Sequence, residues 1–171
     1  LRKICVAVEC FHKASLIHDD IEDNDDQRYG EQTLHASHGI PLALNVGDLL
    51  IGEGYRLIAA TKLSAEQKSH MLQISAEGHR QLCRGQGAEL SWMRSPRPLK
   101  AVEVLDIFRS KTAPAFEVAL QMGTVFAGVE LHAEVKDTIH AYSEALGIAY
   151  QIRDDLSDHG EAGETNDLEQ L

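Results

Sequence analysis

The sequence lacks the features of membrane-spanning and disulfide-bonded proteins. It contains no uninterrupted apolar stretch of about 18 residues, the length that spans a bilayer as a helix, so we expect no membrane span. Its three cysteines, Cys5, Cys10 and Cys83, are odd in number and have no metal-ligand spacing, which favours free thiols in a reducing, cytoplasmic environment. It also lacks an initiator methionine and a signal peptide, and it starts within a helical pattern at Leu1. We therefore expect it to be the middle of a longer protein.

Basic residues are also scarce. Lys and Arg total 16 against 27 Asp and Glu, which gives a formal net charge of −11. This excess of negative charge argues against nucleic acid or an acidic membrane as the main partner. It does not exclude an anionic substrate, because metal ions can bridge like charges. The length of 171 residues, 43% of them hydrophobic, predicts a single domain with its own core over residues 1–171.

Hydrophobic periodicity is helical throughout, and no strand-like alternation is visible. We expect a polar loop over residues 24–39, and glycines within the following apolar helix that allow close approach to a neighbouring helix. Ser64 and Gln67 form a capping box, and Pro114 predicts a kink that frees carbonyl groups near Ser110 and Lys111. The pattern predicts an all-α fold of antiparallel helices around a central cavity. The expected helices span residues 1–23, 42–60, 64–92, 101–127 and 131–158.

Two acidic stretches with the same internal spacing each end an apolar helical run. They are Asp19-Asp20-Ile21-Glu22-Asp23 and Asp154-Asp155-Leu156-Ser157-Asp158. The first and last Asp of each are four residues apart, so they share one helix face. Two such faces opposed across a cavity are unstable unless hard cations neutralise them. Because carboxylates and substrate phosphates together suit Mg2+, the repeated spacing predicts a magnesium–diphosphate site between two helices.

Several further motifs occur in a fixed order around these two stretches. Arg28-Tyr29-Gly30 follows the first stretch, Gly47-Asp48-Leu49-Leu50 and Gly85-Gln86 come next, Lys111-Thr112 precedes Pro114, and Tyr150-Gln151 opens the second stretch. In this order they resemble the trans-isoprenyl diphosphate synthases, the polyprenyl synthetase family. The resemblance covers nearly all of the chain and implies the central portion of an isoprenoid-synthase helical bundle, without the family's N-terminal and C-terminal helices.

The resemblance also implies an activity and a metal site. The family's enzymes are magnesium-dependent prenyltransferases that condense isopentenyl diphosphate with an allylic diphosphate to give a longer trans-prenyl diphosphate, and they usually form homodimers. Asp19, Asp23 and Asp154 would then ligate Mg2+. The remaining aspartates of the two motifs, Asp20, Asp155 and Asp158, would orient waters and the ligating carboxylates. Asp158 is also counted in the metal site.

The resemblance assigns the substrate-binding residues as well. Arg28 and Lys111 would grip the allylic diphosphate, and His12 would lie near isopentenyl diphosphate. Gln151 and the carbonyl of Thr112 would face the developing allylic cation. Leaving-group charge is then stabilised where it develops.

The chain departs from the family pattern at several points. Tyr29 replaces a second Arg that in the family contacts isopentenyl diphosphate, no Lys follows Asp158, and the segment with the family's Gly-Lys-Arg isopentenyl site is absent. Two other interpretations therefore stay open. The protein could be a noncatalytic or regulatory subunit with the same fold, or a class I terpene cyclase or other diphosphate-releasing enzyme.

Product length is expected to depend on the helix before Asp19. Ala14 and Phe11 lie three residues apart on one face, along which the growing chain would run. Ala14 is small and leaves this path open, whereas Phe11 could close it one turn deeper. This favours geranylgeranyl diphosphate or a longer product. The alternative is that Phe11 only packs against a neighbouring helix.

Overall fold

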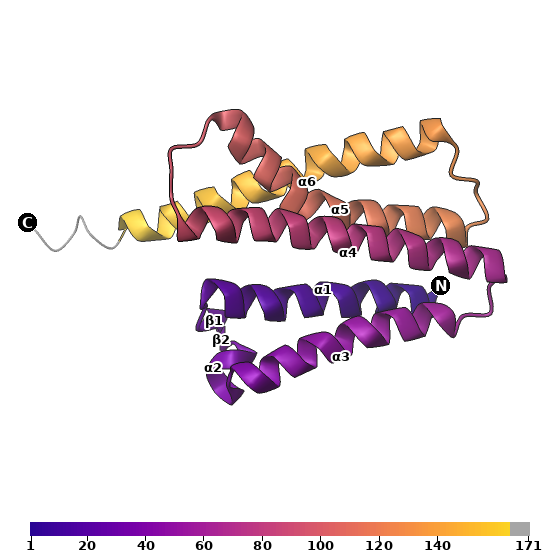
Figure 1. The fold of residues 1–171 in the computed structure, drawn as a ribbon, viewed down its shortest axis with the longest axis horizontal. Helices are drawn as coiled ribbons and strands as arrows, with labels where there is room; N and C mark the ends of the chain where they lie inside the picture. Colours follow the sequence, from indigo (N-terminus) through magenta and orange to yellow (C-terminus); the bar gives the residue numbers. More distant parts are fainter. Residues whose placement is uncertain (165–171) are drawn as a thin grey trace, which may run out of the picture. The chain divides into compact units, whose positions relative to one another are not determined.

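A computed structural model of the chain describes the backbone of residues 1–164 and the side chains of residues 1–153 and Leu156. Within these residues the fold is helical apart from one short hairpin, which confirms the expected all-α class (Figure 1). The chain groups into two compact units. The first holds residues 1–74 and 122–130, and the second holds residues 75–121 and those from 131 onward. The elements are α1 (Arg2–Asp23), β1 (Gln27–Arg28), β2 (Glu31–Gln32), α2 (Leu34–His38), α3 (Ile40–Ala59), α4 (Ala65–Arg94), α5 (Ala101–Phe126) and α6 (Ala133–Glu164).

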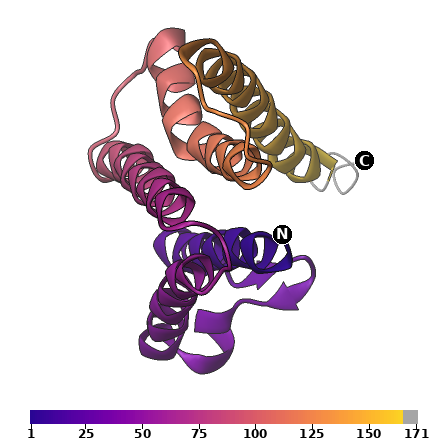
Figure 2. The same cartoon turned by 90° about the vertical axis from the view of Figure 1, so that its right-hand side faces the viewer.

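The first unit is built on the pairing of α1 with α3, which lie side by side in both views (Figures 1 and 2). Small side chains make the approach close. A Cβ added at Gly47 would lie 2.2 Å from Nε2 of His18, and one added at Gly54 would lie 2.5 Å from the Phe11 ring. The expected use of these two α3 glycines is therefore confirmed. Gly47 and Gly54 each make room for one large side chain of α1, whereas a Cβ at Gly52 would meet nothing within 4 Å. The buried residues of the pair are Ile4, Ala7, Cys10, Ala14, Asp20, Ala43, Gly47, Gly54 and Ile58.

The segment between α1 and α3 differs from the expected loop. Strands β1 and β2 pair antiparallel, with Arg28 opposite Glu31, and the short helix α2 follows. Tyr29 and Gly30 connect the strands, both with positive φ, 56° and 79°. Two left-handed residues define the tight turn whose twist matches that of a hairpin. The expectation of a featureless loop is wrong here because two-residue strands are too short to produce an alternating pattern.

Helix boundaries follow the capping signals in the sequence. The backbone N–H of Gln67 donates to the Ser64 hydroxyl at 3.1 Å, and the backbone N–H of Ser64 donates to Oε1 of Gln67 at 3.3 Å. This reciprocal pair confirms the capping box before α4. Pro41 lies in the first turn of α3, where its missing N–H costs no helical hydrogen bond.

The second unit packs α5 against both α4 and α6 through glycines. A Cβ at Gly85 of α4 would lie 2.5 Å from the carbonyl oxygen of Ser110, and one at Gly147 of α6 would lie 2.7 Å from the backbone N of Ala113. Pro114 lies inside α5, which changes direction along its length in Figure 1. The backbone around residues 110–113 is therefore enclosed by glycines on two sides. Among the described helices, none has the length and apolar character required to cross a bilayer.

Candidate active site

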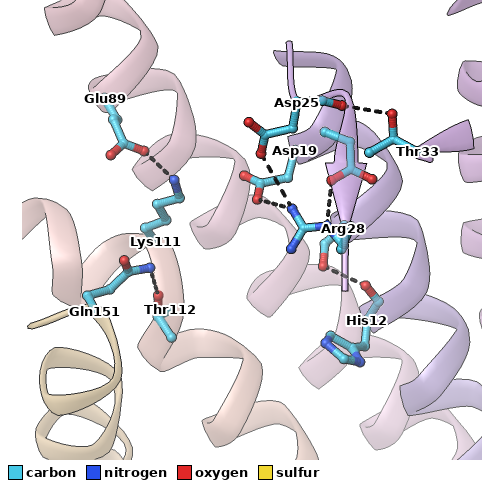
Figure 3. Close-up of polar contacts among 11 residues, drawn as sticks. His12, Asp19, Asp25, Arg28, Thr33, Glu89, Lys111, Thr112 and Gln151 are labelled. Carbon is cyan, nitrogen blue, oxygen red and sulfur yellow. Dashed lines mark hydrogen bonds and ion pairs between the residues drawn. The ribbon is translucent and has the colours of Figure 1, made fainter. Parts of the chain in front are cut away.

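The first acidic motif closes α1 and is paired with an arginine from the hairpin. Nε of Arg28 donates to the Asp20 carboxylate at 2.5 Å, and its Nη2 lies 3.4 Å from Asp19 and 4.0 Å from Asp25 (Figure 3). Asp20 is only 5% exposed, whereas Asp19 and Asp23 are half-buried. The short hairpin thus carries its one cation back onto the helix end that precedes it.

The electrostatics of this pair are set by opposing effects. Burial of the Arg28 guanidinium lowers its pKa, but the hydrogen bond to Asp20 and the charges of Asp20 and Asp19 outweigh this, so the pKa of Arg28 lies above its ordinary value. Arg28 is therefore a permanent cation beside three carboxylates. It already compensates the buried Asp20.

Asp19 and Asp23 fit a magnesium ion in the way this ion is usually held. Mg2+ keeps several waters and binds through one or two carboxylates plus substrate phosphates. The two side chains are one turn apart on α1 and half-buried, while Asp20 is buried and bonded to Arg28. No cluster of three metal-binding side chains occurs among the described residues. The two carboxylates of the first motif therefore fit an ion whose remaining ligands are waters and substrate phosphates.

The second unit gathers three of the predicted residues near the glycine-enclosed backbone of α5. Nζ of Lys111 lies 2.6 Å from a carboxylate oxygen of Glu89, and Nε2 of Gln151 donates to the Thr112 hydroxyl at 2.6 Å (Figure 3). Gln151 was expected to act beside the carbonyl of Thr112. The bond observed is to its side-chain oxygen.

The remaining predicted residues have different surroundings. His12 is exposed and pairs with Glu9 at 3.5 Å, two helical turns before Asp19. Ala14 is fully buried. The Phe11 ring packs edge-on against Tyr55, with ring centroids 5.0 Å apart, and covers Gly54. This is the arrangement expected if Phe11 packs against a neighbouring helix. The side chains of Asp154, Asp155 and Asp158 lie outside the described residues, although their backbone belongs to α6.

Three polar residues next to the predicted ones had no role assigned to them from the sequence. Glu89 pairs with Lys111, His18 lies 3.7 Å from Asp48, and Thr33 bonds the loop before the hairpin. Glu89 lies four residues after Gly85 and so shares its helix face, which is the only signal that could have pointed to it. Pairings between residues far apart in sequence are not visible in local spacing.

The first unit thus has an acidic helix end paired with its own arginine, and the second unit has a proline-containing helix that carries Lys111 and Thr112. The Polyprenyl synthetase family model matches residues 1–167. The chain therefore belongs to the polyprenyl synthetase family, as the motifs predicted.

Curated relatives extend the same result. A short chain isoprenyl diphosphate synthase of Methanocaldococcus jannaschii is 33% identical over 153 residues, which cover 89% of this chain and 45% of that protein. A farnesyl diphosphate synthase of Escherichia coli is 33% identical over 159 residues, covering 89% and 52%. The chain thus spans about half the length of the curated relatives it matches.

Solved structures agree with the sequence relatives. The geranylgeranyl pyrophosphate synthetase from Pyrococcus horikoshii matches with a TM-score of 0.83 and 30% identity, covering 91% of this chain and 47% of that one. A geranyltransferase from Helicobacter pylori, solved with magnesium and isoprenyl diphosphate, matches with a TM-score of 0.84 and 28% identity, covering 91% and 52%. The fold is therefore that of the isoprenoid synthases.

Proposed function

We propose that the protein is a magnesium-dependent trans-prenyltransferase that condenses isopentenyl diphosphate with an allylic diphosphate. The observation that carries this proposal is the Arg28 guanidinium held on Asp20 at the end of α1, with the half-buried carboxylates of Asp19 and Asp23 on the same helix end. The curated relatives, which are prenyl diphosphate synthases, support the same activity. In this proposal Asp19, Asp23 and Asp154 ligate Mg2+, with Asp158 in the same site.

The roles of the basic residues follow from their chemistry. Bound Mg2+ would supply positive charge to the leaving diphosphate. Arg28 offers a planar set of N–H donors suited to phosphate oxygens, and Lys111 offers a compact ammonium. Because Lys111 is mostly buried and already paired with Glu89, its ammonium is held in place before a ligand arrives. Both cations act where leaving-group charge develops.

Gln151 and Thr112 are proposed to face the allylic cation. The Gln151 amide donates one proton to the Thr112 hydroxyl, and this bond fixes the orientation of the side chain. The amide oxygen, which carries the negative end of the amide dipole, would then point toward the positive charge that develops on the allylic substrate. His12, exposed on α1 before the motif, is proposed to contact isopentenyl diphosphate.

One assay of the full-length protein tests the proposal against its rivals. The protein is incubated with Mg2+ and an allylic diphosphate, with isopentenyl diphosphate present or absent, and the products are identified. Elongated product that depends on isopentenyl diphosphate supports the proposal. Release of diphosphate without isopentenyl diphosphate indicates a terpene cyclase or related enzyme. No turnover by well-folded protein indicates a noncatalytic subunit.

A homodimer is proposed through the outer side of α3. Gly47 and Gly54 face α1 within the chain, but Leu42 and Leu49 lie exposed on the opposite side, with Gly52 open beside them. Light scattering at micromolar concentration should report a dimer that Leu49→Glu weakens. Val129→Glu, at an exposed apolar residue of the α5–α6 loop, is the matched control. A monomeric wild-type protein would contradict the proposal.

A further inference from the structure

Thr33 uses its side chain in an unusual way. It is the N-cap residue of α2, where a threonine hydroxyl commonly accepts a hydrogen bond from the first turn, yet it makes no such cap. Its hydroxyl instead donates to the carbonyl oxygen of Asp25 at 2.7 Å, eight residues back, and the residue is only 3% exposed. Because the hydroxyl proton is used there, the oxygen can only accept at Nδ1 of His35, 3.2 Å away, so this nitrogen carries a proton.

The same residue closes the hairpin loop with its backbone. The N–H of Thr33 donates to the carbonyl of Asp26 at 3.0 Å, next to the side-chain bond to Asp25. At its other end the loop is tied to α1, since the N–H of Asp25 donates to the carbonyl of Asp20 at 2.9 Å. Thr33 therefore joins the end of β2 to the segment that leaves α1. Arg28 lies between these two attachments.

The hairpin needs such attachments because it cannot hold itself. Each strand has two residues, and isolated two-stranded hairpins are marginal in water. Its turn also places Tyr29, which has a side chain, in the left-handed region at φ 56°. A strained turn on so short a ladder would let Arg28 move away from Asp20 unless the loop were closed at its base.

We propose that the Thr33 hydroxyl positions Arg28. By closing the base of the hairpin loop, it holds the Arg28 guanidinium at the first acidic motif. The inference rests on the proposed function, in which Arg28 grips a diphosphate. Thr33 does not touch the guanidinium. It sets the direction from which Arg28 reaches Asp20, and it thereby tunes diphosphate affinity from outside the site.

The test uses Thr33→Val, which keeps the shape but removes the hydroxyl, and Thr33→Ser, which keeps the hydroxyl. Binding of inorganic pyrophosphate in the presence of Mg2+ to the full-length protein is measured by calorimetry. Thr33→Val should raise the Kd about tenfold, the lower end of losses seen for groups that orient a site's ligands. Thr33→Ser should stay close to wild type. Ser37→Ala is a matched control, because that hydroxyl bonds the Thr33 carbonyl and not the loop.

A second readout separates positioning from folding stability and from the proposed function. The NMR resonance of the Arg28 Nε–H, hydrogen-bonded to Asp20, should be lost or shifted in Thr33→Val and kept in Thr33→Ser. In an Arg28→Gln background, Thr33→Val should add no further loss of affinity. An unchanged Nε–H resonance and Kd in Thr33→Val, even with a lowered Tm, overturns the proposal, as does an additive loss in the double variant. A wild-type protein that binds no pyrophosphate overturns the proposed function, while the resonance still decides the role of Thr33.

Discussion

The Gln151 side-chain amide of α6 donates a 2.6 Å hydrogen bond to the Thr112 hydroxyl of α5, 39 residues earlier in the chain. Both residues lie beside backbone that Gly85 and Gly147 enclose, so the bond crosses the α5–α6 contact where the two helix backbones approach closely. An amide held in this way has one orientation. A side-chain dipole that stabilises developing charge without reorienting during the reaction must be held in one orientation beforehand.

Thr112→Val should leave the Gln151 amide without its acceptor. We expect the free energy of unfolding to fall by about 1 kcal/mol, the usual net value of one hydrogen bond, and kcat to fall while KM for the allylic substrate changes little. Chemical denaturation and steady-state kinetics measure the two effects. Thr112→Ser retains the hydroxyl and is the control, and equal losses in both variants would mean that the methyl group matters instead.

Asp19 and Asp20 should respond oppositely when removed. Asp19→Ala, like Asp154→Ala, should abolish turnover, yet the metal-free protein should keep or gain thermal stability because a crowded acidic site loses one charge. Asp20→Ala removes the partner of Arg28 and should cost about 2 kcal/mol of unfolding free energy, typical of hydrogen bonds to charged groups. Thermal denaturation in a chelator compares the variants. Similar destabilisation by Asp19→Ala and Asp20→Ala would assign both carboxylates to structure.

Product length tests the two interpretations of Phe11. Ala14→Phe should shorten the prenyl product, and Phe11→Ala should lengthen it if the ring forms the pocket floor. Because the ring covers Gly54 and meets Tyr55, Phe11→Ala should also cost about 3 kcal/mol of stability. Chromatography of the products and denaturation of the same samples give both results. A stability loss with unchanged product length leaves Phe11 with a packing role only.

His140 makes the stability of the α5–α6 contact depend on pH. Its Nδ1 lies 3.0 Å from Glu117 of α5 and its Nε2 lies 3.4 Å from Glu144, which also pairs with Arg109 at 3.0 Å. The hydrogen bond to Glu117 raises the pKa of His140 against the opposing effect of burial, and the charges of Glu117, Glu144 and Asp137 add to it. The imidazolium therefore stabilises the folded state fully below the ordinary pKa of about 6.5, and this contribution disappears as pH rises through the elevated value.

Comparison of wild type with His140→Gln across pH 5.5 to about 9 measures this contribution. The wild-type advantage should be present at low pH and absent at high pH. It should stay below about 1 kcal/mol, because the side chain is largely exposed. In a Glu117→Gln background, the difference in unfolding free energy between His140 and His140→Gln proteins should lose most of its pH dependence. A difference that persists unchanged at high pH would show that the ring acts through packing and not through charge.

Local chemistry explains why most helices could be predicted. Three signals act within one or two helical turns and can therefore be recognised from the sequence. They are the Ser64–Gln67 capping box, Pro41 in a first turn and the apolar stripe before Asp19. The hairpin could not be predicted in this way. Its turn uses Tyr29 where asparagine or glycine is usual, and its contacts with the rest of the chain, Thr33 with Asp25 and Arg28 with Asp20, are not visible in local spacing.

The site was predictable in composition but not in pairing. The spacing of Asp19, Asp20 and Asp23 marked the acidic motif, but it did not distinguish the carboxylate that is buried against Arg28 from the two that are half-buried. Lys111 was expected from its place before Pro114, whereas its partner Glu89 comes from another helix. Such partners are fixed by tertiary packing, here the approach that Gly85 permits, and a single sequence carries no direct record of it.

The contact at Gly85 also bears on how this chain can vary. Any side chain there would meet the carbonyl and the following nitrogen of the α5 backbone, which no rotamer change can move aside, while Gly87 two residues later faces open space. In a saturation library, position 85 should accept glycine alone and position 87 should accept many residues. The restriction comes from the shape of two helices and not from any reaction. A lineage that lost catalysis but kept its fold would therefore still inherit Gly85.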